Sequence, residues 1–571
     1  MSQGPAKTAD QPAGAPKTVA LAPGTGDAPR RNRLVLSAAQ AAALIGDGAT
    51  VIVGGSGSLL QVPETMLRAV EERFMTEGHP SGLTAIHVMG LGDNTGRGVD
   101  HIAHEGLVSR FIGSHFVLSP RQQKLIASDR VEAIGLPAGT ITLLYREIAG
   151  GRPGLFTDIG LETFVDPRQQ WGRMNSITTE GLSQLVEIDG KPWIFYPRFG
   201  IDVALLRGTE ADEDGNISME EEASFSDNLA AAQAAHNSGG VVIAEVKRVV
   251  ERGSIAAGRV RVPGALVDHV VLTDYPNQTP ITVYEASRTG QHPHRPIDVP
   301  VLPLDYRKAV ARRAAMELTE NELVNLGVGM ANGISYVALE EGFLDRLTLT
   351  VEQGLFGGLP GVGLDSGTAL NPSAMIDMSS QFDLYDGGAL DLAGLAFAQV
   401  DRHGNVNVTQ VDGTPIGPGG FIDISQKART VVFCGSFRGG GLDVSVVPNS
   451  RETGGICINS EGRYPKFVTE VDSITFSADR AVRDGQRALY VTERAVFALG
   501  AGGLELIEVA PGVELQRDVL DHLPFAPVMR RRPKVMDPRI YNAGPMGLAL
   551  RGPRGSRSAP SEARDREEVD V

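Results

Sequence analysis

Hydrophobic and polar positions along the chain follow helical and strand patterns in alternation. Residues 38–45 have the closely spaced apolar side chains of a helix, and residues 49–53 form an apolar strand that leads into the glycine turn G-G-S-G. Another helix is expected to begin at Pro63, with acidic residues in its first turn. This order of strand, glycine turn and helix predicts an α/β fold with parallel strands.

The same order of elements returns in the second part of the chain. Residues 307–318 have a helical pattern, residues 322–326 form a strand followed by G-V-G-M, and a helix is expected over residues 333–341. Two further pairs of segments match in the same order, namely 83–90 with 347–354 and 211–217 with 400–406. Landmarks that recur in one order predict a duplicated domain.

The repeats predict two related open α/β domains with the active site between them. We expect an N-terminal domain over residues 34–287 and a C-terminal catalytic domain over residues 304–535. The proline-rich stretch 288–303 separates them and is the expected linker. Residues 1–33 and 536–571 have compositions typical of flexible tails.

Bulk composition limits the class of protein and its partners. A net charge of −16 argues against a general nucleic-acid-binding protein, but it is compatible with a local basic pocket for an anionic ligand. The two cysteines, Cys434 and Cys457, predict no disulfide framework and fit a reducing cytoplasm. No apolar run of about 18 residues is present, so no membrane span is expected. We therefore expect a cytoplasmic protein whose partners are small molecules.

One carboxylate stands at an unusual place in the sequence. In T-V-E-Q-G-L-F-G-G-L-P-G, Glu352 follows an apolar strand and precedes a glycine-rich loop. Ligands of open α/β sheets bind at the carboxyl ends of the strands, where this residue is expected. The matched position in the first part of the chain is Val88, so the fold does not need a carboxylate there. A solvated loop glutamate is the alternative interpretation.

Two downstream motifs could serve such a carboxylate. In I-G-P-G-G-F, residues 416–421, successive glycines could direct backbone N–H groups at an oxyanion, or they could form only a tight turn. In D-R-H-G-N-V, residues 401–406, Asn405 could orient a carboxylate or hydrogen-bond its own hairpin turn. The first part of the chain has a copy of this motif with Asn216, which favours the turn for the motif as a whole.

Taken in order, V-E-Q-G-L-F-G-G-L-P, D-x-x-G-N and G-x-G-G-F resemble motifs of the family I coenzyme A transferases. Segments elsewhere resemble the fused, single-chain branch of that family, which comprises acetate/propionate-type and acetoacetyl-type enzymes. These segments are residues 105–115, 152–168, 237–248, 492–497 and 510–515. The resemblance covers roughly residues 35–530.

The resemblance implies that Glu352 is the nucleophile of a ping-pong reaction through a glutamyl-CoA thioester. The side chain of a solvated glutamate has a pKa of about 4.3, so we expect it to be an anion at neutral pH without an activating base. Backbone N–H groups of Gly419 and Gly420 would stabilise the oxyanion, each such donor being worth ~2.7–4 kcal/mol. Asn405 would orient Glu352. No bound cofactor is expected, because the CoA thioester is the substrate.

Residues that contact CoA or the acyl group are expected in several glycine loops, by pseudosymmetry and by the freedom of glycine backbones to approach a ligand. An arginine in S-F-R-G-G-G-L could bind a phosphate, although a plain surface loop is an equal alternative. The predicted contact residues are Gly90, Gly92, Gly327, Gly329, Gly354 and Arg438.

Two positions depart from the family pattern. Gln353 stands where Ser or Asn is common, and Pro418 stands where alanine is common. Neither change removes a catalytic atom, but Pro418 has no N–H, so the oxyanion donor must be a neighbouring glycine.

Three other sequence features resemble parts of functional sites but have a simpler structural interpretation. The spacing G-V-G-M-A-N-G over residues 327–333 is not the dinucleotide fingerprint. His101 and His104 could share a helix face, but no third ligand is evident, so no metal is expected. Cys434 follows apolar residues and is expected in the core.

The resemblance leaves function open between related activities. The main hypothesis is CoA transfer among short-chain acids such as acetate, propionate, butyrate and acetoacetate. An acyl-CoA hydrolase that uses the same glutamate and a non-catalytic acyl-CoA sensor are the alternatives. The resemblance also implies a homo-oligomer, with a tetramer as the expected size.

Overall fold

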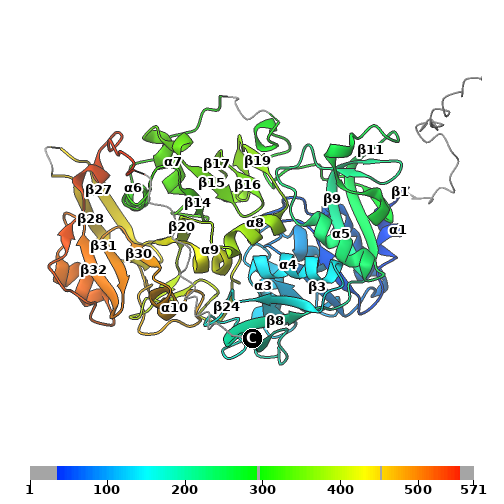
Figure 1. Ribbon diagram of the computed structural model, residues 1–571, viewed down its shortest axis with the longest axis horizontal. Helices are drawn as coiled ribbons and strands as arrows, with labels where there is room; N and C mark the ends of the chain where they lie inside the picture. Colours follow the sequence, from blue (N-terminus) through cyan, green and yellow to red (C-terminus); the bar gives the residue numbers. More distant parts are fainter. Residues whose placement is uncertain (1–34, 292–295, 451–452, 553–571) are drawn as a thin grey trace, which may run out of the picture.

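The computed structural model describes residues 35–291, 296–450 and 453–552, which form two large sheets placed side by side (Figure 1). The predicted tail over residues 1–33 lies outside the described residues. An α/β protein with two open sheets, as the sequence predicts, is confirmed.

The first sheet has eight strands in a continuous parallel row, and two short strands pair at its side. In order across the sheet, the row is β1 (Val35–Leu36), β13 (His269–Leu272), β11 (Val241–Val250), β9 (Val203–Asp212), β2 (Thr50–Val53), β3 (Leu83–His87), β4 (Val108–Gly113) and β5 (Glu132–Gly135). The side strands β10 (Ile217–Ser218) and β12 (Val260–Val262) pair antiparallel. Strand β9 is buried along nearly its whole length, because helices and loops cover both faces of a parallel sheet.

Helices of the first half follow its strands, as the alternating pattern predicts. They are α1 (Ala38–Ala42), α2 (Glu64–Glu77), α3 (Pro120–Ala127), α4 (Ala138–Ala149) and α5 (Asn228–Asn237). Helix α1 begins with a reciprocal capping box between Ser37 and Gln40, and it ends three residues before the predicted boundary. Helix α2 begins directly after Pro63, where a helix start is expected.

The second sheet is mixed: four central junctions are parallel and both ends are mainly antiparallel. Its order is β19 (Ala374–Met375), β16 (Leu355–Phe356), β15 (Thr348–Val351), β14 (Leu323–Leu326), β20 (Leu392–Ala396), β25 (Thr430–Cys434), β30 (Arg487–Val491), β31 (Ala495–Gly500), β32 (Gly503–Val509) and β33 (Lys534–Val535). Its helices are α6 (Tyr306–Ala315), α7 (Gly333–Glu340), α8 (Met378–Asp386), α9 (Phe421–Lys427) and α10 (Ala478–Arg483).

The two sheets share one strand order, which supports the predicted duplication. The row β3-β2-β9-β11-β13 in the first sheet corresponds to β15-β14-β20-β25-β30 in the second, and all of these neighbours are parallel. The halves differ beyond β3 and β15. Strand β3 is flanked by the parallel strand β4, whereas the chain after β15 turns back into the antiparallel strand β16.

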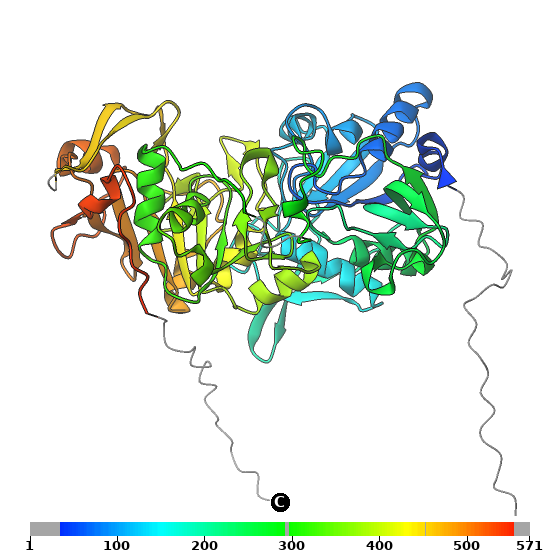
Figure 2. The ribbon, with the colours of Figure 1, turned by 90° about the horizontal axis from the view of Figure 1, so that it is seen from above.

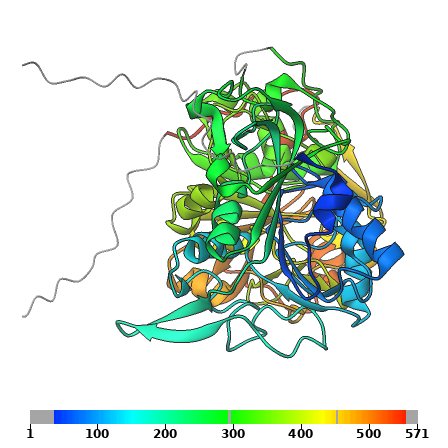
Figure 3. The same cartoon turned by 90° about the vertical axis from the view of Figure 1, so that its right-hand side faces the viewer.

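The boundary between the halves is packed tightly, with α8 and α9 near the middle of the molecule (Figure 1). Helix α4 of the first half packs on α8, where Arg146 and Asp383 form an ion pair. Viewed from above, the halves lie along one long axis (Figure 2). A small sheet of β6 (Gly154–Thr157), β8 (Lys191–Pro197) and β7 (Gln184–Ile188) includes a hairpin that projects from the body (Figure 3).

The stretch that follows the second sheet corrects one prediction. We predicted a flexible tail over residues 536–571, but residues 536–552 are described and partly buried, with Ile540 and Tyr541 fully enclosed. The buried guanidinium of Arg312 donates to the carbonyl oxygens of Ile540, Asn542 and Gly544 at 2.7–3.0 Å. These bonds satisfy a buried charge and hold the stretch against α6, an interaction that composition alone does not reveal.

No helix in the described ranges is long and apolar enough to cross a membrane.

Candidate active site

Glu352 is the first residue after strand β15, at the carboxyl end that faces the boundary between the halves. The chain reverses immediately, because the Gly354 N–H donates to the Val351 carbonyl at 3.0 Å. Gly354 has φ +94°, and a Cβ atom there would lie 2.0 Å from the Ile376 carbonyl oxygen. Gly354 therefore shapes the turn that presents Glu352, and we find it in the turn rather than in the cavity wall.

A cavity of about 230 Å³ surrounds the Glu352 carboxyl group and is lined from both halves. Glu352, Gly327 and Gly420 line it from the second half, and His115 lines it from the first. The placement puts a carboxyl group in a cavity at a strand end, where ligands of α/β sheets bind.

The protonation of Glu352 differs from the sequence expectation. The residue keeps some exposure to the cavity, while protein surrounds its carboxyl group, and this desolvation raises its pKa to about 7. A hydrogen bond from Gln353 opposes the rise. The expectation of a side chain that is an anion at neutral pH without further help is therefore opposed by the structure, because burial favours the neutral acid.

The glycine loop at residues 416–420 lies against this carboxyl group. A Cβ atom on Gly420 would be 2.0 Å from Oε2 of Glu352, so a glycine is required for the contact. Within the described ranges, no acceptor is recorded for the Gly420 N–H, whereas the Gly419 N–H donates to the Ser114 carbonyl at 2.6 Å. The structure therefore argues against Gly419 as an oxyanion donor and leaves Gly420, which directly precedes α9.

The first half holds this loop by backbone hydrogen bonds. The Phe116 N–H donates to the Ile416 carbonyl at 2.8 Å, and the Ala138 N–H donates to the Gly419 carbonyl at 2.9 Å. Together with the bond from Gly419 to Ser114, these contacts fix the loop relative to Glu352. Sequence reasoning missed them, since no local pattern marks which carbonyl a distant loop will contact.

Asn405 does not orient Glu352 in this structure. Its amide nitrogen donates to Oδ2 of Asp401 at 2.9 Å, and its amide oxygen accepts from the Ala478 N–H at 2.9 Å. Among the described residues, Asn405 is not part of the wall around Glu352. Asn216 in the first half makes the same pair of bonds, to Asp212 and Gly264. Both copies act as turn residues, so the predicted catalytic role of Asn405 is corrected.

Two of the predicted contact glycines lie behind the cavity. A Cβ atom on Gly90 would lie 2.5 Å from Nδ1 of His115, so Gly90 makes room for a residue of the wall. A Cβ atom on Gly92 would lie 2.2 Å from the Leu118 carbonyl oxygen, so Gly92 serves close backbone packing. Neither glycine is part of the wall that the structure describes.

Arg438 is also placed away from the cavity. Its guanidinium donates to the Gly462 carbonyl at 2.7 Å and thus ties together two short strands, β26 (Arg438–Gly439) and β29 (Tyr464–Pro465). The suggested phosphate contact of Arg438 finds no support in this geometry.

A second, larger cavity of about 540 Å³ adjoins the first and shares Asn332 and Ala396 with it. Gly329 lines it, together with the basic residues Arg307, Lys308 and Lys466. Lys308 is paired with Glu340 at 2.8 Å, and burial lowers the pKa of Lys466, whose ammonium contacts the Phe397 carbonyl at 3.2 Å. Sequence reasoning did not identify this cavity, because its basic residues come from segments far apart in the chain.

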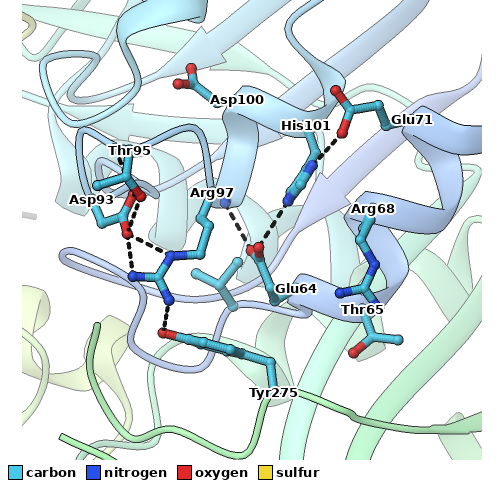
Figure 4. A network of polar contacts seen from close by, with 12 residues as sticks. Glu64, Thr65, Arg68, Glu71, Asp93, Thr95, Arg97, Asp100, His101 and Tyr275 are labelled. Atoms are coloured by element: carbon cyan, nitrogen blue, oxygen red, sulfur yellow. Dashed lines mark hydrogen bonds and ion pairs between the residues drawn. The ribbon is translucent and has the colours of Figure 1, made fainter. Parts of the chain in front are cut away.

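The two histidines considered as metal ligands belong to a polar network in the first half, of which Figure 4 shows the part around His101. His101 contacts Glu71 and, at 2.8 Å, Glu64; His104 contacts Glu71 at 2.7 Å. The neighbouring bonds join Arg97 to Asp93 at 2.6 Å and to Tyr275. Within the described part of the chain, no group of three or more side chains is arranged to hold a metal ion.

Cys434 lies buried in the core of the second half, as predicted, and burial raises the pKa of its thiol to about 12. A thiol held neutral in this way is a packing residue rather than a nucleophile.

Comparison with known proteins links this chain to a family. A sequence profile of the family described as Coenzyme A transferase matches residues 35–273. The chain is 43% identical over 516 residues to the caffeate CoA-transferase of Acetobacterium woodii, covering 89% of this chain and 97% of that enzyme. It is 41% identical over 522 residues to the acetate CoA-transferase YdiF of Escherichia coli K12, covering 90% of this chain and 96% of YdiF.

Solved structures agree with the sequence comparison. The apoenzyme of the acyl-CoA transferase YdiF from Escherichia coli O157:H7 matches with a TM-score of 0.86 at 40% identity, covering 91% of this chain and 98% of that chain. A second YdiF structure, a thioester complex with CoA, matches with the same TM-score.

Proposed function

The chain belongs to the coenzyme A transferase family, and on this premise we propose that it transfers CoA between an acyl-CoA and a short-chain carboxylic acid through a thioester on Glu352. The observation that supports this most is the placement of the Glu352 carboxyl group. It lies at a cavity lined from both halves, in contact with the Gly420 backbone. The existence of a YdiF thioester complex with CoA supports the covalent route.

In the first step, the ionised Glu352 carboxylate attacks the carbonyl carbon of the acyl thioester. The carbonyl oxygen becomes an oxyanion, and we assign the Gly420 N–H as its donor, because this N–H has no acceptor among the described residues and Gly420 contacts Glu352. Collapse breaks the C–S bond and gives a mixed anhydride and CoA thiolate. The thiolate then attacks the glutamyl carbonyl, the anhydride C–O bond breaks, and the acid leaves as its carboxylate.

The second half-reaction runs these steps in reverse with the acceptor acid. Its carboxylate attacks the glutamyl thioester, CoA thiolate leaves, and the thiolate attacks the acyl carbonyl of the new anhydride. Glu352 returns as a carboxylate, so protons and charges balance over the cycle. Water that reached the glutamyl thioester would release free CoA, so transfer requires that the acceptor acid reacts faster than water.

We assign the CoA chain to the second cavity. It adjoins the first at Asn332 and Ala396, so a thiol at Glu352 can continue into it. Arg307 replaces Arg438 as the candidate phosphate contact, because it lines this cavity and, among the described residues, has no carboxylate partner recorded within ion-pair distance. The overall negative charge of the chain is compatible with such a local basic site.

The acid class and the setting are part of the same proposal. The acetate CoA-transferase YdiF supports acetate and related short-chain acids as substrates. Two unpaired cysteines, Cys434 and Cys457, support a reducing cytoplasm, and the family resemblance supports a homo-oligomer.

Mass spectrometry of the protein, whole and after digestion into peptides, tests the proposed route. Incubation with acetyl-CoA should add the mass of CoA, less one water, to a peptide that contains Glu352, and acetate should remove it. An enzyme that releases thiol at the same rate without any acid would instead be a hydrolase. If the protein bound acetyl-CoA but formed no adduct and released no thiol, the result would support the alternative of a non-catalytic acyl-CoA sensor.

A further inference from the structure

His115 is the residue by which the first half enters the Glu352 cavity. It follows strand β4, in a segment whose neighbours on both sides hold the catalytic glycine loop. The Ser114 carbonyl accepts from Gly419, and the Phe116 N–H donates to Ile416. A Cβ atom on Gly417 would lie 2.9 Å from the His115 Cα, so the two backbones touch at this point. The backbone of His115 is therefore fixed relative to the loop that contacts Glu352.

The imidazole of His115 packs closely against the first half. Its Nδ1 lies against Gly90, where a Cβ atom would come within 2.5 Å. Nε2 is the ring nitrogen that lies outside this contact. Within the described ranges, no hydrogen-bond partner is recorded for either ring nitrogen of His115. The nearby buried His87 contrasts with it, since its nitrogens contact the Met89 carbonyl and the Gln122 amide at 2.7 and 2.8 Å.

Other polar side chains of the cavity wall are already engaged. Asn325 donates to the Thr350 carbonyl at 3.2 Å, and Asn332 donates to the Gly361 carbonyl at 3.0 Å. The Ser366 hydroxyl donates to the Gly363 carbonyl at 2.6 Å.

Gln353 also lines the cavity, and its buried Oε1 is an acceptor that has no partner among the described residues. An acceptor repels a carboxylate. No lysine or arginine belongs to the described wall of this cavity. His115 therefore supplies the side-chain N–H that is free to bind an anionic acid.

Burial lowers the pKa of His115 to about 4, so the ring is neutral at neutral pH. In this form it keeps one N–H donor and does not carry a charge that would pair with Glu352.

We propose that His115 binds the carboxylate of the acid acceptor, with its Nε2–H donated to the oxygen that does not attack the Glu352 thioester. The inference rests on the proposed function, and it assigns acid recognition to the first half. The same bond holds the acyl oxygen when the half-reaction runs in the opposite direction.

Steady-state kinetics with acetate and propionate test this role. His115→Ala should lower kcat/KM for both acids about 10- to 100-fold, the usual range for a lost hydrogen bond to a charged group. His115→Gln keeps an N–H donor and should recover most of this loss. The inhibition constant of desulfo-CoA, which has no thiol to transfer, should stay within about twofold of the wild-type value, since no acid contact contributes to its binding.

A glycine pair provides a matched test that leaves His115 in place. Gly90→Ala would push a methyl group into Nδ1 of His115 and should reproduce the loss in acid kcat/KM. Gly46→Ala is the control, since a Cβ atom there meets nothing within 4 Å. Its acid kinetics should match the wild type.

Three outcomes would overturn the proposal. Acid kcat/KM could be unchanged in His115→Ala, desulfo-CoA binding could weaken as much as acid use, or His115→Gln could be as impaired as His115→Ala at an unchanged melting temperature. Failure of the proposed function is a separate result, because the wild-type protein would then form no CoA adduct on Glu352.

Discussion

The ends of strands β3 and β15 lie at matching positions in the two halves, but one end is buried and the other faces a cavity. Val88, after β3, is 1% exposed, because the neighbouring parallel strand β4 extends the sheet beside it. Glu352, after β15, faces a cavity, because the chain turns back into β16 and no parallel strand follows on that side. One topology thus provides a closed strand end in one half and an open one in the other.

The two halves of this duplicated fold contribute different groups to one cavity. The second half carries the carboxyl group and the glycine loop. The first half carries no carboxylate at the matched position, but its Ser114–Phe116 segment fixes the loop and supplies His115 to the cavity. The carboxyl group therefore lies at one strand end, and the other half supports the loop beside it.

Removing the carboxylate should have the largest effect. Glu352→Ala should lower CoA transfer by about 10⁴-fold or more, because the reaction loses its nucleophile. The measurement is acetyl-CoA formation from propionyl-CoA and acetate, with unchanged melting as evidence of folding. Residual transfer within about tenfold of the wild type would contradict the covalent role.

Moving the carboxylate to the other half sharpens the same comparison. Val88→Glu, added to Glu352→Ala, should restore no transfer, because the strand end at Val88 is closed. It should instead lower stability by about 3 kcal/mol or more, as an unpaired buried carboxylate does, and lower the melting temperature.

Adding a methyl group to the glycine loop should have the next largest effect. Gly420 has φ −86°, which alanine also adopts, so Gly420→Ala acts through the contact with Glu352 rather than through backbone strain. We expect kcat/KM to fall about 10²- to 10³-fold, since the carboxyl group and the oxyanion donor move apart. Gly200→Ala is the control, because a Cβ atom there meets nothing within 4 Å. Equal activity of the two variants would argue against the contact.

The raised pKa of Glu352 predicts a pH dependence of moderate size. The neutral acid cannot attack, so kcat/KM for acyl-CoA should reach a plateau above about pH 7 and fall about tenfold per unit well below it. The folded protein binds this proton more tightly than the unfolded chain, so the stability contribution is lost as the pH rises from about 4.5 through 7. Glu352→Gln should therefore melt higher than the wild type at pH 8 and alike at pH 4.5; the opposite order would contradict the raised pKa.

Substitution of the asparagine in either of the two matching turns should have the smallest effect, and the two variants should lose similar amounts of stability. Asn405→Ala and Asn216→Ala each remove a pair of side-chain bonds from a turn, so each should cost about 1–2 kcal/mol of stability. Transfer activity should change less than about threefold in either, because neither amide contacts Glu352. A selective loss of activity in Asn405→Ala would restore the catalytic role that the sequence suggests.

The sequence predicted elements well where the signal is local or repeated. Strand, glycine turn and helix are visible in the apolar spacing, and comparison of the repeats identified both the α/β fold and the unusual place of Glu352. The turn around Asn405 was also indicated by its copy at Asn216, although the resemblance to known transferases suggested a catalytic role for it. The repeat was the better guide, because both copies make the same bonds.

Order along the chain, apolar periodicity and the repeat are properties of neighbouring residues, and the sequence by itself determined them: two α/β halves and a carboxylate at one strand end. Only the tertiary structure decided three features: among the described residues the Gly419 N–H has an acceptor and the Gly420 N–H has none, burial raises the pKa of Glu352 to about 7, and His115 lines the cavity from the other half. These features depend on which distant groups meet and how much water they exclude. Hydrogen bonds and desolvation arise from that meeting, so they become visible only once the two halves are in place.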